Sequence, residues 1–321
     1  MGQNRLLMRI VFMGTPDFAV PCLDILVKSE HDVVAVITAT DKYGGRGRKQ
    51  LIQSAVKKYA VENDIPVLQP PNLKNSQFIE ELRSYNADLQ IVVAFRMLPV
   101  VVWDMPALGT YNLHGSLLPR YRGAAPINWA IINGDQNTGV TTFKLKHEID
   151  TGSIAFQESI KIYKNDNVES VHDRMKTIGA EVVLKTVQHI SSGKIQLREQ
   201  NNALVTKAPK IFHKDCHIDP FKDVLHNYNL IRGLSPYPTA WTTLGDKKLK
   251  IFSALYSYEN HNHEPGSFIY VKRSRKLIYY VSQGYLELVD VQMEGRKRML
   301  VKDFMNAFNL KQNNLPFRLL D

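Results

Sequence analysis

The chain has 321 residues, of which 44% are hydrophobic, and it carries a formal net charge of +10. This length predicts about two domains, and the composition is that of an ordinary soluble globular protein. The sequence has no run of eighteen apolar residues, which excludes a transmembrane helix, and its first residues lack the apolar core of a signal peptide. Two widely separated cysteines, Cys22 and Cys216, make neither a zinc knuckle nor a disulfide framework and favour a reducing cytoplasm.

Positive charge is concentrated in the last third of the sequence. From residue 201 onward there are 18 Lys and Arg against 11 Asp and Glu, whereas the first 200 residues have 23 against 20. Such an excess suits a polyanionic partner and predicts a C-terminal part that holds nucleic-acid phosphates. A generically basic surface that serves solubility explains the same numbers equally well.

The first half of the chain alternates strand-like and helix-like segments, because short apolar runs predict strands and 3-4 spacing predicts helices. In chain order these are a strand at 9–14, a helix at 18–27, a strand at 33–37, a helix at 51–63, a strand at 66–68, a helix at 78–85 and strands at 89–94 and 109–113. This alternation predicts right-handed βαβ units and a Rossmann-like, doubly wound, mostly parallel sheet. Ligands bind such sheets beyond the carboxyl ends of the strands, where residues 14–16, 94–96 and 112–114 would gather.

The second half changes from helical to β-rich character. Apolar residues at 3-4 spacing from Val168 predict a long amphipathic helix to about Ile190, and residues 196–210, which lack periodicity, predict a linker. A helix at 221–231 is followed by five short β-rich runs, at 239–243, 249–253, 267–271, 277–281 and 285–289. They predict a small OB-like C-terminal β-barrel. We therefore expect a catalytic domain at 1–190, a linker at 191–211 and a basic domain at 212–321.

Asn112 and His114 stand two residues apart at the end of the apolar run 109–113. On a strand, residues i and i+2 share one face, so both side chains would point at the same small volume. An Asn amide and a protonated His are two hydrogen-bond donors, which is what a developing oxyanion needs. A carboxylate such as Asp150, brought close by the fold, would favour the imidazolium form and orient the ring. This set predicts acyl transfer without a covalent intermediate, although a lone Asn-x-His pair is more often structural.

The residues around this motif extend the match to a known family. Residues 112–126 (NLHGSLLPRYRGAAP), with 13–19 (MGTPDFA), 44–49 (GGRGRK) and 150–152 (DTG), resemble the signature of the folate-dependent formyltransferases, and the similarity runs over nearly the whole chain. The resemblance implies that Asn112, His114 and Asp150 are catalytic. The first two would stabilise the negative oxygen, and Asp150 would relay a proton, directly or through a water. No metal and no nucleophilic side chain is expected.

The resemblance also implies a slot for 10-formyltetrahydrofolate as the formyl donor, with its pterin against backbone amides. The residues expected to line it are Phe95, Arg96, Met97, Leu98, Ser116, Leu117, Leu118, Pro119, His147, Glu148 and Ile149. From the residues alone, ordinary βα loops with apolar core residues are the favoured interpretation of these segments. Arg96 stands where many family members have a small residue, which bears on the shape of the slot. Ser116 is expected to be structural or to position substrate, because Leu118 replaces the second glycine of a nucleophile elbow.

Basic clusters outside this site are expected to bind tRNA. In the tRNA-directed members of the family, the loop that matches residues 41–49 contacts the acceptor arm, which implies this role for Arg46, Arg48 and Lys49. A basic surface loop with no such role is the alternative. The residues expected to hold tRNA phosphates from the C-terminal clusters are Lys207, Lys210, Lys248, Arg273 and Arg298. A single run of charged residues is usually just a solvated surface. The expectation of phosphate binding therefore depends on the presence of several basic clusters in the C-terminal part.

The resemblance thus implies an enzyme that moves a formyl group from 10-formyltetrahydrofolate to the α-amino group of methionine on initiator tRNA, as a cytoplasmic monomer. A formyltransferase for a small amine, such as an amino-sugar nucleotide or glycinamide ribonucleotide, would keep the same three catalytic residues. The Arg46 loop and the basic C-terminal part count against that alternative. A non-catalytic RNA-binding protein with this fold and a hydrolase that releases formate are two further alternatives.

Overall fold

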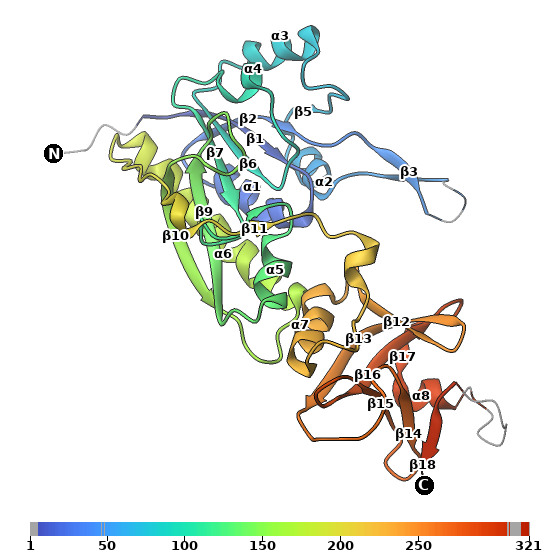
Figure 1. Cartoon of the computed structure of the whole chain (residues 1–321). Helices are drawn as coiled ribbons and strands as arrows, with labels where there is room; N and C mark the ends of the chain where they lie inside the picture. Colours follow the sequence, from blue (N-terminus) through green and yellow to red (C-terminus); the bar gives the residue numbers. More distant parts are fainter. Residues whose placement is uncertain (1–5, 46, 48, 307, 309–315, 321) are drawn as a thin grey trace. The chain divides into compact units, whose positions relative to one another are not determined.

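The computed structural model describes residues 6–45, 47, 49–306, 308 and 316–320. The chain divides into two compact units (Figure 1). Unit 1 consists of Met1–Gly123, Thr138–Ile160 and His172–Ala208, and unit 2 of Ala124–Asn137, Lys161–Val171 and Pro209–Asp321. The chain thus passes between the units several times, and each unit is described separately.

Unit 1 is built on a seven-stranded sheet with the order β10-β9-β7-β6-β1-β2-β5. The strands are β1 (Arg9–Gly14), β2 (Asp32–Ile37), β5 (Val67–Leu68), β6 (Leu89–Val93), β7 (Thr110–His114), β9 (Asn137–Lys144) and β10 (Ile154–Lys161). The pairs from β5 through β7 are parallel, whereas β9 runs antiparallel to β7. The predicted mostly parallel sheet is confirmed, and β9 and β10 add an edge that was not predicted.

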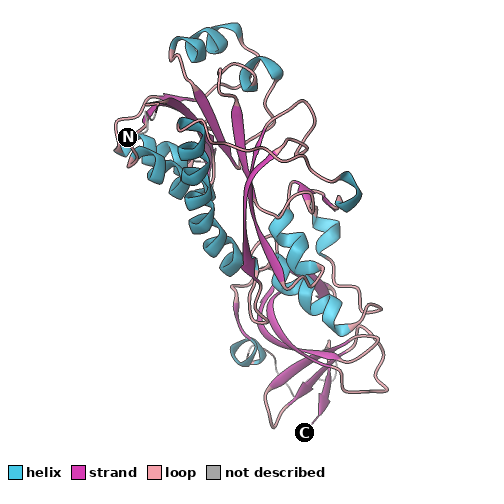
Figure 2. Cartoon of the chain, turned by 90° about the vertical axis from the view of Figure 1, so that its left-hand side faces the viewer, coloured by secondary structure: helices cyan, strands magenta, loops and turns pink. Residues whose placement is uncertain are grey.

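Helices cover both faces of this sheet because its strands are buried on both sides. They are α1 (Val20–Val27), α2 (Ala55–Glu62), α3 (Ser76–Ser84), α4 (Val100–Trp103) and α6 (Val168–Ser191). On one face, Phe78 and Leu82 of α3 join Val11 and Met13 of β1 in one hydrophobic cluster. Elsewhere α6 runs beside the strands (Figure 2), and Gly179 of α6 lies against Leu113 of β7 with no room for a Cβ atom. Strand β7 is therefore packed closely against α6.

The predicted helix at 51–63 is wrong at its beginning. Strand β4 (Gln50–Ile52) pairs with β3 (Lys42–Gly44) as a hairpin, and α2 begins after Ser54, whose hydroxyl accepts a hydrogen bond from the Lys57 N–H at 3.0 Å. Pairing across the glycine-rich turn decides the conformation of residues 50–52, and the Ser54 cap then sets the start of the helix.

Unit 2 contains a curled, mostly antiparallel sheet with the order β12-β13-β16-β15-β14-β18, and β17 pairs with β16. The strands are β12 (Ala240–Leu244), β13 (Lys247–Ser257), β14 (Phe268–Val271), β15 (Lys276–Tyr280), β16 (Tyr285–Met293), β17 (Met299–Leu300) and β18 (Arg318–Leu320). The five predicted runs correspond to β12 through β16, so the predicted OB-like half-barrel is confirmed. Its core includes buried side chains such as Leu249, Tyr279 and Phe304.

Among the described residues, the α-helices of unit 2 are α5 (Pro126–Ile132), α7 (Val224–Leu234) and α8 (Val301–Met305). Helix α5 packs on α7, where the Asn128 amide donates to the carbonyl of Gly233 at 2.8 Å and Ile132 joins the unit 2 core. A segment that follows β8 (Arg122–Gly123) directly in sequence thus belongs to the second unit. In the part of the chain that the structure describes, no helix combines the length and the apolar character needed to cross a bilayer.

Candidate active site

Strand β7 presents Asn112 and His114 at the carboxyl edge of the unit 1 sheet. Their i and i+2 positions on β7 place them on the same face, as predicted. His114 is 6% exposed, and Asn112 is half-buried opposite Phe143 of β9. Because β7 is paired with β6 on one side and β9 on the other, both side chains project from a rigid backbone.

The imidazole of His114 is held by the backbone carbonyl of Tyr121. Nε2 lies 2.8 Å from that oxygen, and because a carbonyl can only accept, Nε2 carries the hydrogen. The other ring nitrogen, Nδ1, lies 3.9 Å from Oδ2 of Asp150. Nδ1 is therefore the nitrogen left for chemistry, and the Asp150 carboxylate is its counter-charge whenever Nδ1 takes up a proton.

Asp150 adopts a backbone conformation that non-glycine residues seldom use, with φ at 54°. Two hydrogen bonds hold it there. Its Oδ2 accepts from the Gly123 N–H at 2.9 Å, and its carbonyl accepts from Nε2 of Gln200 at 2.9 Å. The direction of the carboxylate toward His114 is thus fixed by neighbouring backbone and by a buried amide.

The side-chain amide of Asn112 is available to a ligand. Among the residues that the structure describes, it forms no hydrogen bond, although a half-buried amide normally has a partner. Together with Nδ1 of His114, which donates only when the ring is protonated, it offers two donors on one face of β7, with a carboxylate beside them. Such a set can stabilise a negative oxygen and move a proton without a metal or a nucleophilic side chain.

Ser116 follows this strand, and its hydroxyl is used inside the loop. The Ser116 Oγ donates to the Arg120 carbonyl at 2.6 Å, and the Ser116 carbonyl accepts from Thr141 at 2.6 Å. The side chain is fully buried. The next loop residue of interest, Leu118, packs with Phe143 in a small hydrophobic cluster. These contacts agree with the structural role expected for Ser116.

Two loops predicted to line the folate slot combine exposed apolar side chains with unpaired backbone amides. Met97 is 71% exposed and Ile149 is 60% exposed, whereas Leu98 is buried. Within the described residues, the backbone N–H groups of 95–98 and 146–150 donate no hydrogen bond. His147 and Glu148 are exposed in the second loop. This combination fits a flat heteroaromatic ring whose edges need hydrogen bonds.

Arg96 is anchored beside the same loop. Its guanidinium donates to the carbonyl of Pro71 at 3.0 Å and also to the carbonyl of Pro70. The guanidinium carbon lies 5.6 Å from the centre of the Phe95 ring. These contacts fix the cation on the 70–71 turn, so the Arg96 side chain has a defined position at the edge of the loop.

The β3–β4 hairpin carries the basic loop, and it extends from the rest of unit 1 (Figure 1). Arg46 and Arg48 lie outside the described residues, whereas Lys49 is exposed and Tyr43 is 69% exposed. The base of the hairpin is anchored by Asp41, which pairs with Lys57 of α2 at 2.5 Å. Hydrogen bonds from Lys57 and Gln69 hold the pKa of Asp41 below its usual value.

The predicted C-terminal cations differ in their surroundings. Lys207, Lys210 and Arg273 are exposed, whereas Arg298 is paired with Asp290 at 2.7 Å. A phosphate would have to compete with that carboxylate for Arg298.

Lys248 belongs to a cluster that the sequence analysis did not find. Its ammonium lies 2.9 Å from His213 Nε2 and 4.7 Å from the centre of the Trp241 ring. His213 stacks on the same ring, with centroids 4.8 Å apart. Cation and aromatic faces together are typical of RNA contacts, but these three residues are distant in sequence and carry no local signal.

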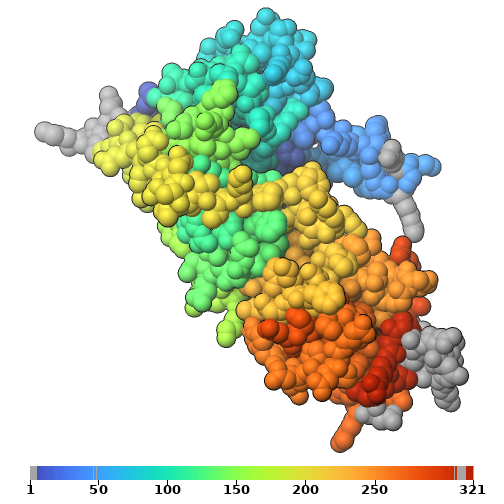
Figure 3. All heavy atoms as spheres, viewed as in Figure 1, coloured from blue at the N-terminus to red at the C-terminus, as the bar shows by residue number. Residues whose placement is uncertain are grey.

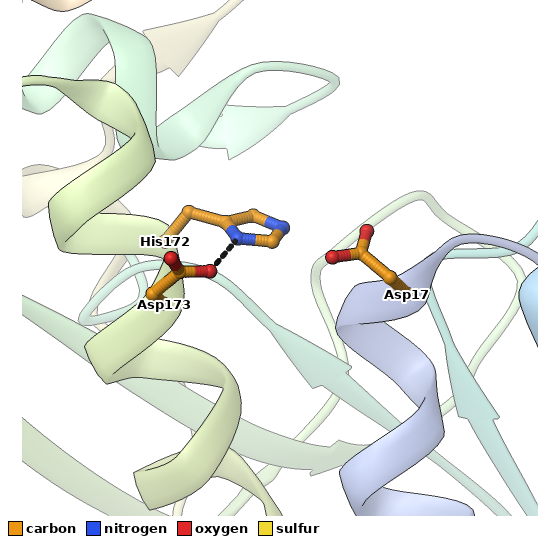
Figure 4. Close-up of side chains that lie close together, drawn as sticks. All are labelled: Asp17, His172 and Asp173. Atoms are coloured by element: carbon orange, nitrogen blue, oxygen red, sulfur yellow. Dashed lines mark hydrogen bonds and ion pairs between the residues drawn. The ribbon is translucent and has the colours of Figure 1, made fainter.

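One group of potential metal ligands lies in unit 1, where His172 and Asp173 of α6 face Asp17 (Figure 4). The ammonium of Lys176 lies 2.8 Å from Asp173 and 3.7 Å from Asp17. The hydrogen bond to Asp173 raises the pKa of Lys176, and the same bond lowers the pKa of Asp173. A lysine thus supplies the positive charge between these carboxylates.

Comparison with known proteins agrees with this geometry. The profile of the formyl transferase family matches residues 8–187, and that of the formyl transferase C-terminal domain matches residues 210–309. Methionyl-tRNA formyltransferase of Parabacteroides distasonis is 52% identical over 311 residues, which cover 94% of this chain and 96% of that protein. HypX from Aquifex aeolicus in complex with tetrahydrofolic acid shares the fold, with a TM-score of 0.64 and 17% identity over 98% of this chain and 49% of that one. WlaRD, a sugar 3N-formyl transferase, shares it with a TM-score of 0.64 and 20% identity over 91% of this chain and 100% of that one. The chain therefore belongs to the formyl transferase family.

Proposed function

We propose that the protein transfers the formyl group of 10-formyltetrahydrofolate to the α-amino group of methionine on initiator tRNA. The observation that carries the proposal is the meeting of two donors on β7, Asn112 and His114, with the Asp150 carboxylate 3.9 Å from the ring. The substrate is inferred from the methionyl-tRNA formyltransferase that is 52% identical to this chain.

In this reaction Asn112 and His114 act on the formyl oxygen. As the amine nitrogen attacks the formyl carbon, negative charge develops on that oxygen, and the Asn112 amide and a protonated Nδ1 of His114 donate hydrogen bonds to it. Donors fixed in advance need no reorganisation at that moment, and each contributes about 3 kcal/mol to stabilising the transition state. The Nε2–H bond to Tyr121 keeps Nδ1 on the reacting side of the ring.

Asp150 carries the proton that the reaction moves. The attacking amine forms a bond from nitrogen to the formyl carbon and loses a proton, and the folate N10 regains a proton as its bond to that carbon breaks. Asp150 takes the first proton and returns it to N10, directly or through a water. One proton leaves the amine and one reaches N10, and the substrates are neither oxidised nor reduced. The reaction therefore needs no oxidant, and this scheme uses no metal and no covalent enzyme intermediate.

The folate is held by the loops at 95–98 and 146–150. Their free N–H groups pair with the edge of the pterin, and the exposed Met97 and Ile149 side chains cover its faces. The first loop follows β6 at the carboxyl edge of the sheet, where open α/β sheets bind ligands. The second loop leads to Asp150, whose carboxylate lies 3.9 Å from His114 at the end of β7.

The tRNA is bound by basic residues of both units. Arg46, Arg48 and Lys49 contact the acceptor arm from the hairpin. Phosphates further along the molecule are held by Lys207, Lys210, Lys248, Arg273 and Arg298. The enzyme works as a cytoplasmic monomer, where Cys22 and Cys216, both buried and free, stay reduced.

The test is transfer of a radiolabelled formyl group from 10-formyltetrahydrofolate to different acceptors. Charged initiator tRNA is expected to be formylated, while charged elongator tRNA, amino-sugar nucleotides and glycinamide ribonucleotide react far more slowly. Preference for a small amine would replace this proposal by a small-molecule formyltransferase. Formate release without an acceptor would indicate a hydrolase, and tRNA binding without either reaction would indicate an RNA-binding protein.

A further inference from the structure

The segment 198–208, here called the strap, is fastened to the rest of unit 1 at both ends and at points between them. It begins at Arg198, which exchanges two backbone hydrogen bonds with Ile154 at 2.7 and 2.9 Å. It ends in strand β11 (Lys207–Ala208), which pairs in parallel with β8. In Figure 3 the strap is the yellow segment on the surface of unit 1. The sequence predicts a linker here, and the contacts below give this segment a further role.

Gln200 lies at the centre of the strap and is 9% exposed. Its Nε2 donates to the carbonyls of Asp150 at 2.9 Å and Gly152 at 2.8 Å. Its Oε1 accepts from Nε and Nη2 of Arg122 at 3.0 and 2.7 Å. One buried amide thus uses both of its ends to join the Asp150 loop to the segment that ends in Gly123. Gly123 is the residue whose N–H holds the Asp150 carboxylate.

A second strap residue holds the partner of His114. The Tyr121 N–H donates to Oγ1 of Thr206 at 2.8 Å, and the carbonyl of Tyr121 accepts the Nε2–H of His114. Tyr121 has φ at 60°, again a left-handed value. The strap therefore supports both sides of the gap between Nδ1 of His114 and Oδ2 of Asp150.

We propose that Gln200 is a positioning residue for the reaction, and that it acts by holding Asp150 in its left-handed conformation with the carboxylate directed at His114. Left-handed conformations of non-glycine residues are strained and persist when surrounding contacts over-determine them. Without the two Nε2 hydrogen bonds, Asp150 relaxes and its carboxylate moves away from the ring. The kinetic test of this proposal rests on the proposed function. A second test, which observes the nitrogens of His114, needs only the geometry around that ring.

The kinetic test compares two substitutions of Gln200. Gln200→Ala is expected to lower kcat by about 10-fold to 100-fold, the loss that a displacement near 1 Å causes, with KM for both substrates nearly unchanged. Gln200→Glu keeps the acceptors for Arg122 but removes both donors, so it is expected to lose kcat as Gln200→Ala does. Full activity of Gln200→Glu would assign the effect to Arg122 and overturn the proposal.

The matched control is Asn227→Ala in α7 of unit 2. Asn227 is also a buried amide that donates to backbone carbonyls, those of Asp219, Lys222 and Asp223. It is expected to lower the melting temperature and leave kcat unchanged. If Gln200→Ala lost kcat no more than Asn227→Ala does at equal loss of stability, the positioning role would be refuted.

The second test observes His114 directly, in protein labelled with 15N at its ten histidines, with His114→Ala used to assign its signals. In the wild type, Nε2 is expected to carry the hydrogen. Gln200→Ala is expected to shift both nitrogen signals of His114, and Asn227→Ala to leave them in place. Unmoved signals in Gln200→Ala would overturn the proposal. Because this readout needs no turnover, it stands even if the wild type formylates none of the acceptors, an outcome that would refute the proposed function alone.

Thr206→Val covers the case in which Gln200→Ala does not fold. Thr206 is exposed, so its replacement is compatible with folding, and valine removes the oxygen that holds the Tyr121 N–H. A drop in kcat with a moved His114 signal would support a positioning role for the strap. Wild-type kcat and signals in both Thr206→Val and Gln200→Glu would refute it.

Discussion

The two nitrogens of His114 have separate roles. Nε2 is committed to the Tyr121 carbonyl, which leaves Nδ1 and its neighbour Asp150 as the changeable pair. The Asn112 amide adds a neutral donor, and its ability to donate a hydrogen bond does not depend on pH. The site thus combines one fixed donor, one donor that depends on a proton, and one carboxylate that can exchange protons with a substrate.

Replacement of His114 by Ala is expected to lower turnover by a factor on the order of 10² or more, because a donor to the developing oxyanion is lost. The affinity for tRNA is expected to stay similar, because the phosphate contacts lie elsewhere. Single-turnover formylation and filter binding measure the two quantities separately. His226→Ala, at an exposed position of α7, is the control and is expected to match the wild type. Weaker tRNA binding with intact turnover would contradict the role given to His114.

At the scale of elements, the β3–β4 hairpin is the part of unit 1 that we propose distinguishes tRNA from smaller acceptors. It has two exposed strands and an exposed aromatic residue, Tyr43, and its base is tied to α2 by the ion pair of Asp41 and Lys57. This arrangement fits a structure that presents cations to a large partner while remaining anchored at one end.

Arg46→Ala is expected to raise KM for charged tRNA at least several-fold while folate binding stays unchanged. The reason is that the substitution removes a cation proposed to contact the acceptor arm and leaves the loops proposed to bind folate unchanged. Steady-state kinetics with each substrate varied in turn measure the effect. Lys58→Ala, which removes an equal charge from an exposed position of α2, provides the comparison. Equal effects of the two substitutions would mean that general charge and not the hairpin matters.

The elements predicted from sequence are those whose side chains carry apolar periodicity. Strand β1 with its Ile, Val and Phe, and the long helix α6, follow the predicted bounds closely. Strand β9 was missed because three of its buried positions are threonines, Thr138, Thr141 and Thr142. The motif predicts that Asn112 and His114 share a strand face and that Asp150 lies near His114, and the structure has this arrangement. The contacts of Gln200 were not predictable, because they join residues far apart in sequence.

At the scale of the whole molecule, residues 201–321 have 18 Lys and Arg against 11 Asp and Glu, so the affinity proposed for tRNA should depend strongly on salt. Arg273→Ala is expected to reduce the slope of log K against log salt by about one unit, because one phosphate contact is lost. Arg298→Ala should reduce it less, because Asp290 already neutralises that guanidinium. Binding measured over a series of salt concentrations tests both, and an unchanged slope in both variants would remove these clusters from the interface.

The bounds of the two domains can be tested by truncation. The family profiles leave a gap from 188 to 209, and the predicted boundary at residue 190 falls inside it. A fragment of residues 1–190 lacks the strap, whereas 1–208 retains it. We expect the longer fragment to melt at a higher temperature, because the strap contributes hydrogen bonds to the His114 and Asp150 loops. Calorimetry of the two fragments measures this, and equal melting temperatures would mean that the strap adds no stability to unit 1.

Surface segments between domains usually accept insertions readily, and the strap should be an exception. Gln200 holds the loop of Asp150, and Thr206, six residues later, holds the loop of Tyr121. Strand β11 then pairs with β8. One extra residue between positions 200 and 206 would move Thr206 away from Tyr121 while Gln200 stayed bound to Asp150. If this constraint holds, the length of this stretch should be constant among relatives, while the sequences on either side of it vary.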